Sequence, residues 1–167
     1  MDKDSEAQIE RDLYRTFPRH PLYASTQVDG VLTEGKAVKK LKNVLVAFAN
    51  YEIHVDYVQG MNFIVGSLLL HASETMAFWL FVSLIEDCGV RDIFTPRLPG
   101  LYKHSQIIDR LISIHMPQLY EHFYCNNIRA EMFCSEWIFG LFSSVIPLDQ
   151  MTLFWSHFFE GGWIYFY

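Results

Sequence analysis

The strongest constraint on the fold is a helical spacing of apolar residues that recurs along the whole chain. Just before residue 70, Met61, Ile64, Val65, Leu68 and Leu69 repeat at the three- and four-residue intervals of one helical face. No stretch shows the sustained alternation of apolar and polar residues that marks a half-buried strand. The pattern therefore predicts an irregular, multi-helix, all-α fold with no sheet.

Local signals set the expected limits of the first helices. Ser5 and Gln8 form a capping-box pattern, which predicts a first helix that begins at Ser5, runs through Phe17 and is ended by Pro18. Residues 24–35 read as a surface loop. The next helix carries its apolar stripe on Val38, Leu41, Leu45 and Phe48, with lysines largely on the other face. Residues 51–59 read as a connection, and a further helix is expected from Gly60.

The second half of the chain predicts five more helical segments. Ser73 is the expected N-cap of a helix that is apolar almost all round over 76–85 and so belongs at the centre, with Gly89 closing it. A helix carries Leu101 to Ile112, and Pro117 begins a short one. Two more are expected at about 130–145 and 147–160. The unbroken apolar end, residues 163–167, predicts either a segment docked on the core or a natural chain that continues, and we favour the second.

Composition restricts the function classes. With 167 residues, 51% of them hydrophobic, the chain is expected to fold as one domain. The formal net charge of −6 argues against a non-specific nucleic-acid binder, which needs a basic surface. Three cysteines without a CxxC pair predict free thiols in a reducing, cytoplasmic compartment. The longest apolar runs fall short of the ~20 residues of a membrane span, and the seven histidines show no metal-ligand spacing.

Two short stretches stand apart from the packing pattern. In IERDLYRTFP, Asp12 and Arg15 are three residues apart, so on a helix the carboxylate can orient the guanidinium. In YVQGMN, Gln59 precedes a helix beside Gly60, and its carboxamide can both donate and accept hydrogen bonds, as holding a water molecule requires. Taken singly, the first reads as an ordinary solvated ion pair and the second as a loop residue.

Together the two stretches resemble a known family. IERDLYRTFP is similar to the IxxDxxRTFP arginine motif, and YVQGMN to the YxQGMN glutamine motif, of the TBC domains that activate Rab GTPases. They occur in the family's order. Segment 43–48 resembles the family's helix before the glutamine motif, and segments 77–79, 136–142 and 158–161 resemble later parts of the pattern, so the likeness covers nearly the whole chain.

The resemblance implies roles for individual residues. It makes Arg15 an arginine finger and Gln59 a glutamine finger, both inserted beside GTP on a GTP-bound Rab, with Asp12 positioning Arg15. Supporting geometry is expected from Thr16, Tyr57, Gly60 and Asn62, and candidate partner contacts from Arg19 and His20. The chain would need no cofactor or metal of its own, because GTP and magnesium arrive with the partner. Endomembrane recruitment would follow through the Rab.

Some residues depart from the family pattern, which leaves alternatives open. Asp56 stands where glycine is usual, so the loop carrying Gln59 is expected to differ in backbone angle, and Ser156 replaces a usual aspartate. The family's first and last helices are expected to be missing from residues 1–167. One alternative is therefore a catalytically inert TBC module that binds a Rab or another partner as a scaffold. A helical scaffold unrelated to GTPases would make the paired motifs a coincidence.

Overall fold

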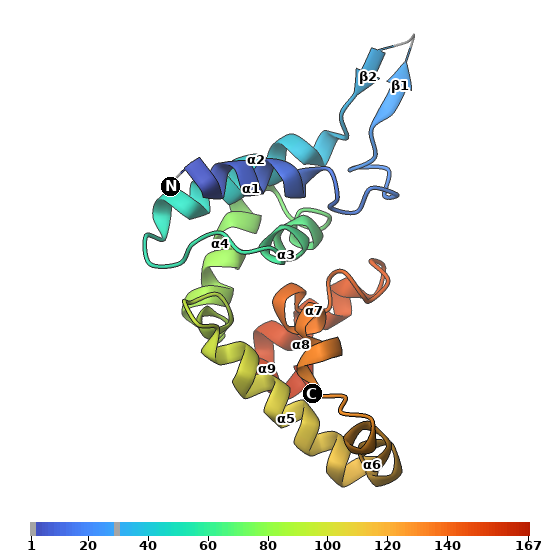
Figure 1. The fold of residues 1–167 in the computed structure, drawn as a ribbon. Coiled ribbons are helices and arrows are strands. Elements are labelled where there is room, and N and C mark those ends of the chain that lie inside the picture. The colour runs from blue at the N-terminus through green and yellow to red at the C-terminus, as the bar shows by residue number, and fades with distance from the viewer. Residues whose placement is uncertain (1–2, 29–30) are drawn as a thin grey trace.

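A computed structural model describes residues 3–28 and 31–167 of the chain. Figure 1 shows a curved arrangement in which α1 to α4 gather at one end, α5 runs away from them, and α6 lies at the far end. Helices α7, α8 and α9 lie on the inner side of this curve, and a hairpin projects beyond α2. The fold is all-α, as the spacing of apolar residues predicted.

Four helices form the first part of the core. They are α1 (Lys3–Leu13), α2 (Lys36–Tyr51), α3 (Met61–Leu68) and α4 (Glu74–Glu86), and α2 packs against each of the other three. The predicted stripe of α2 is its buried face, while Lys36, Lys39 and Lys40 are exposed. Helix α3 is buried almost throughout, as its apolar composition requires.

The first helix ends earlier than predicted. It spans Lys3–Leu13, so it neither begins at Ser5 nor continues to Phe17. After Leu13 the backbone tightens into a turn in which the Thr16 amide donates to the Leu13 carbonyl at 3.3 Å. Phe17 then has a positive φ of 47°, which a right-handed helix excludes. Arg15 consequently lies in a turn just beyond α1 and not on the helix itself.

One short hairpin corrects the expectation of no sheet. Within the predicted loop at 24–35, β1 (Thr26–Val28) pairs antiparallel with β2 (Val31–Thr33), and Thr26 lies opposite Thr33. Strands of three residues are too short to show a period of two, so the pattern could not reveal them. The hairpin forms no layer of the core.

Helix α4 is capped as predicted but is less central than predicted. The hydroxyl of Ser73 accepts a hydrogen bond from the Met76 amide at 3.3 Å, and Gly89 takes a positive φ of 67° soon after the helix ends. The expectation of burial all round was wrong, because Met76 is 55% exposed and Trp79 is 53% exposed. Only the α4 face toward α2 and α3 is core.

The second half of the chain is also helical. Its elements are the 3-10 turn η1 (Arg91–Ile93), α5 (Pro99–His115), α6 (Pro117–Cys125), α7 (Glu131–Gly140), α8 (Met151–Gly161) and α9 (Trp163–Phe166). Pro117 begins α6, as predicted. The predicted start of α8 was four residues too early, because Pro147 begins a turn that precedes the helix. Helix α7 ends before the predicted 145 because Leu141 and Phe142 have positive φ.

The apolar end of the described chain docks on the core. Phe166 is 5% exposed and stacks on Phe142 with ring centroids 4.5 Å apart. Trp163 stacks on His104 of α5 at 3.4 Å, and the hydroxyl of Tyr167 is hydrogen-bonded to Nδ1 of the same histidine. Docking, the first of the two sequence-based alternatives, is thus observed for Trp163 and Phe166, while Ile164 is 83% exposed.

His104 makes the docked end sensitive to acid. Burial and the nearby Lys103 lower the pKa of His104 from 6.5 to about 4. Between those pH values the unfolded chain binds a proton that the folded chain does not, so stability is lost as the pH falls through this window. We expect the midpoint temperature of thermal unfolding to decrease when the pH is lowered from 7 to 5. We expect His104→Phe to reduce that decrease. His122→Gln, an exposed control on α6, should not. Equal pH slopes for wild type and His104→Phe would assign the effect to other groups.

Candidate functional site

The two sequence motifs meet in the structure through two side-chain bridges. The hydroxyl of Tyr57 donates to the Asp12 carboxylate at 2.7 Å, and the Asn62 carboxamide donates to the Thr16 hydroxyl at 2.9 Å. Both bonds are buried, and each spans more than forty residues of sequence. The end of α1 and the segment that enters α3 are therefore fixed to each other at two points.

Asp12 is the centre of the first bridge. Its side chain is fully buried and forms an ion pair with Nη2 of Arg15, which confirms the predicted Asp12–Arg15 pair. Nε2 of Gln8 lies 3.2 Å from one carboxylate oxygen and 3.4 Å from the other. Burial, and then the bond to Asp12, raise the pKa of Tyr57, so its hydroxyl stays protonated and acts as the donor. The buried carboxylate thus has three partners.

Arg15 is anchored at one side and open at the other. Its side chain is 45% exposed and forms an ion pair with Asp12 through Nη2. A guanidinium carries five N–H donors in a rigid plane. Pairing on one edge therefore fixes the direction of the group while leaving further donors for an anion outside this chain.

A second chain of hydrogen bonds leads to the residue beside Gln59. Thr16 donates its hydroxyl proton to the Asp12 carbonyl at 2.7 Å and accepts from Asn62. The carboxamide oxygen of Asn62 in turn accepts from the Gly60 amide at 3.0 Å. The turn after α1 and the turn before α3 are thus held by one continuous network.

Gln59 lies exposed on the turn that this network holds. Its side chain makes no hydrogen bond within the described residues, so its carboxamide is available to a partner. The following Gly60 has a φ of 116°, and a Cβ placed there would lie 2.6 Å from the Phe139 carbonyl oxygen of α7. Only glycine fits this close approach between the turn and α7.

Asp56 and Ser156, which depart from the family pattern, lie at positions without backbone strain. Asp56 is exposed. It is not among the described non-glycine residues that have a positive φ. The loop therefore does not need glycine at that position. Ser156 is exposed and donates its hydroxyl proton to the Thr152 carbonyl at 2.8 Å.

Arg19 and His20 lie outside the network. Arg19 is exposed, and Nδ1 of His20 accepts from the Leu22 amide at 3.3 Å. The segment that carries them is held by Tyr23, whose hydroxyl donates to the Gly66 carbonyl of α3 at 2.7 Å. The two residues therefore remain candidates for partner contact, on a segment attached to α3.

Sequence reasoning missed two residues that shape the site. Gln8 was interpreted as half of a capping box, yet it lies one helical turn before Asp12 and hydrogen-bonds its carboxylate; the four-residue spacing of Gln and Asp was a usable signal. Phe139 forms the wall against Gly60. No local pattern could have indicated Phe139, because it lies nearly eighty residues away in the chain.

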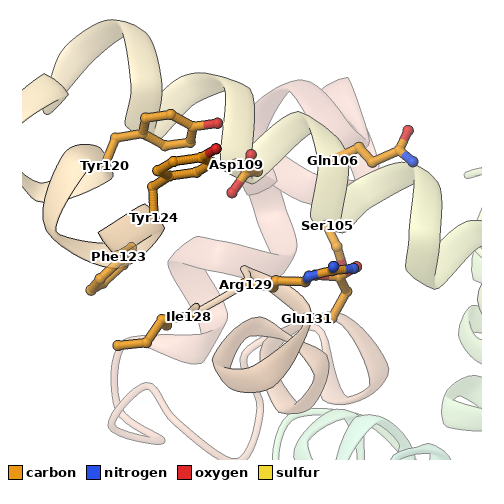
Figure 2. Close-up of a pocket in the computed structure, with 9 residues that line it drawn as sticks. All are labelled: Ser105, Gln106, Asp109, Tyr120, Phe123, Tyr124, Ile128, Arg129 and Glu131. Atoms are coloured by element: carbon orange, nitrogen blue, oxygen red, sulfur yellow. The ribbon is translucent and has the colours of Figure 1, made fainter. Parts of the chain in front are cut away.

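Two clefts differ in their position relative to these elements, and only the first lies beside them. The first, which we call the Gln59 cleft, has a volume of about 400 Å³ and lies between the Gln59 turn and α7. The second, the α5–α6 cleft, has about 240 Å³ and is drawn in Figure 2, where the Tyr120 and Tyr124 hydroxyls point toward Asp109. The second contains none of the predicted site residues.

The described ranges contain no cluster of three or more histidine, cysteine or acidic side chains arranged to hold a metal ion. Cys88, Cys125 and Cys134 are all free thiols. Across the same ranges, no helix combines the length and the apolar character needed to cross a membrane.

Comparison with known proteins agrees with this architecture. A family model described as the Rab-GTPase-TBC domain matches residues 1–167. The chain is 33% identical to the Rab GTPase-activating protein tbc-11 of Caenorhabditis elegans, over 90% of this chain and 15% of that protein. It is 32% identical to the human ecotropic viral integration site 5 protein homolog, over 97% of this chain and 19% of that protein. The chain thus spans less than a fifth of these relatives.

Solved structures show the same fold. The Chlamydomonas flagellar RabGAP TBC domain superposes with a TM-score of 0.77 at 31% identity, over 99% of this chain and 52% of that one. The Ypt/Rab-GAP domain of Gyp1p superposes with a TM-score of 0.78 at 19% identity, over 97% of this chain and 56% of that one. Each solved chain is therefore about twice as long as the matched region.

Proposed function

The chain belongs to the Rab-GTPase-TBC domain family, and on that premise we propose that it accelerates GTP hydrolysis by a GTP-bound Rab. Arg15 and Gln59 would both act in trans on GTP and magnesium held by that partner, through which the chain would reach endomembranes. The observation that carries the proposal is the buried network through Asp12–Tyr57 and Thr16–Asn62. It holds the backbone beneath both exposed side chains in one rigid unit, as two groups acting on a single reaction require.

The role proposed for Arg15 follows from the charge of the reaction. In phosphoryl transfer, negative charge spreads over the phosphoryl oxygens in a loose transition state. A guanidinium already aimed by Asp12 can place its free donors against those oxygens without losing further conformational freedom. The open edge of Arg15 supports this assignment.

The role proposed for Gln59 is to hold the attacking water. Its carboxamide can accept a hydrogen bond from that water and donate another to a phosphate oxygen or a backbone carbonyl. The side chain is exposed and makes no hydrogen bond within residues 3–28 and 31–167, while Asn62 holds the amide of the next residue. No acid or base on this chain is then required.

Gln59→Ala tests this assignment most directly. We expect the variant to reduce the acceleration of GTP hydrolysis by about 100-fold, the usual effect of losing one oriented hydrogen-bonding group in a transition state. The measurement is single-turnover hydrolysis over a panel of GTP-loaded Rabs, with wild type and variant at equal concentrations. Stability should be unchanged because Gln59 is exposed.

The same panel of Rabs also distinguishes the proposed function from the alternative one. Binding of a GTP-loaded Rab by wild type without any rate change would select the inert scaffold module. Acceleration by wild type that survives Gln59→Ala would contradict the role given to Gln59. Gln118→Ala, an exposed glutamine at the start of α6, is a matched control and should behave as wild type.

A further inference from the structure

The Gln59 cleft lies beside the proposed site and is lined by both aromatic and polar side chains. Phe63 of α3 and Phe139 of α7 line it, and Gln59 itself lies on its rim. Its volume of about 400 Å³ is large enough to admit a long side chain. Whatever enters the cleft would therefore contact the turn that carries Gln59.

One wall of the cleft carries a hydroxyl without a partner. Oγ of Ser144 is buried and makes no hydrogen bond within the described residues. Buried polar atoms almost always have partners, so each exception calls for an explanation. A polar group brought into the cleft by a ligand would satisfy this hydroxyl.

Glu136 gives the cleft its charge. The side chain is exposed on α7, lines the cleft, and takes part in no ion pair or hydrogen bond within the part of the chain described. An unpaired carboxylate beside aromatic rings suits one kind of occupant best. A lysine or arginine packs its aliphatic stem on aromatic faces, is attracted to the rings, and ends in a charge that pairs with carboxylate.

We infer that the Gln59 cleft receives a basic side chain of the partner GTPase, packed against Phe63 and Phe139 and paired with Glu136. This inference rests on the proposed function, because it places the cleft inside the same interface. The occupant would contact Phe139, a residue whose backbone lies against Gly60. The same side chain can donate a hydrogen bond to Ser144.

Glu136→Gln tests the inference with a charge change that preserves shape. We expect the GTPase concentration at half-maximal acceleration to rise about tenfold, as for one lost charged pair in a partly exposed interface. The maximal rate should stay the same because Glu136 lies beside, and not among, the reacting groups. Glu131→Gln is the matched control: it removes the same charge from the same helix, in the α5–α6 cleft of Figure 2.

A charge-reversal pair identifies the partner's residue. Glu136→Lys should weaken binding further than Glu136→Gln. Replacing one surface lysine or arginine of the GTPase by glutamate should then restore binding to Glu136→Lys. The same replacement should weaken binding to the wild-type chain. Binding is measured with the GTPase loaded with a non-hydrolysable GTP analogue, so it is read independently of catalysis. Thermal unfolding of each variant confirms that it is folded.

The outcomes separate this inference from the proposed function. If wild type accelerates hydrolysis and Glu136→Gln behaves as wild type, the inference is overturned and the function stands. If no basic residue of the GTPase rescues Glu136→Lys, the basic occupant is wrong. If wild type neither binds nor activates any GTPase of the panel, the proposed function fails and the inference fails with it.

Discussion

Arg15→Ala is expected to lower the acceleration of GTP hydrolysis by about 10³- to 10⁵-fold, the range by which arginine fingers act on other GTPases. The physical reason is that alanine removes the donors and the positive charge from the position where transition-state charge develops. In energy this is about 4 to 7 kcal/mol of barrier. Single-turnover hydrolysis with the most responsive Rab of the panel measures it.

The substitution also affects the fold, so stability has to be measured beside the rate. Without Arg15, the buried Asp12 carboxylate keeps only Tyr57 and Gln8 as donors. The loss of stability should be smaller than the about 3–5 kcal/mol typical of breaking a fully buried pair, because Arg15 is 45% exposed. A cooperative thermal transition at a somewhat lower temperature is the expected result.

Arg15→Lys separates charge from geometry. Lysine keeps the positive charge near Asp12 but lacks the planar fork, so we expect the fold to be retained and most of the acceleration to be lost. Arg110→Ala, an exposed arginine on α5, is the control for non-specific charge effects. Full activity of both Arg15 variants would refute the role proposed for this residue.

Three helices each have a sequence signal that the structure confirms. For α2 the stripe, for α4 the Ser73 cap and for α6 the Pro117 start agree with the structure. The end of α1 could not be placed, because Thr16 donates its hydroxyl proton to the Asp12 carbonyl and Phe17 turns left-handed. The exposed face of α4 could not be predicted either, because an apolar composition does not indicate which face packs against the core.

The candidate site was predictable only in part. The Asp12–Arg15 pair is local, and its spacing predicted it, although Arg15 lies in the turn after α1 and not on the helix that the prediction assumed. The bonds from Tyr57 to Asp12 and from Asn62 to Thr16 depend on how α3 packs beside α1, which no spacing within either motif reveals. The resemblance indicated that these residues matter, whereas the structure shows how they join the two motifs. The catalytic roles of Arg15 and Gln59 stay predictions.

Gly60→Ala should be strongly destabilising, because it combines backbone strain with a close contact to the backbone of α7. The residue has a φ of 116°, which residues with a Cβ rarely adopt, and the added methyl would lie 2.6 Å from a backbone oxygen of Phe139. Backbone strain of this kind accounts for about 1–3 kcal/mol, and the clash adds to it. We expect a loss of more than about 3 kcal/mol in the free energy of unfolding, measured by denaturant titration.

Gly162→Ala is the control that isolates the clash. Gly162 also has a positive φ, of 59°, but a Cβ there would meet nothing within 4 Å, so only the strain remains. We therefore expect Gly162→Ala to destabilise the fold less and to leave GTPase activation intact. Gly60→Ala relieves its clash only by moving the turn away from α7, which displaces Gln59 and opens the Gln59 cleft. A Gly60→Ala protein as stable and as active as Gly162→Ala would show that the turn and α7 are not coupled.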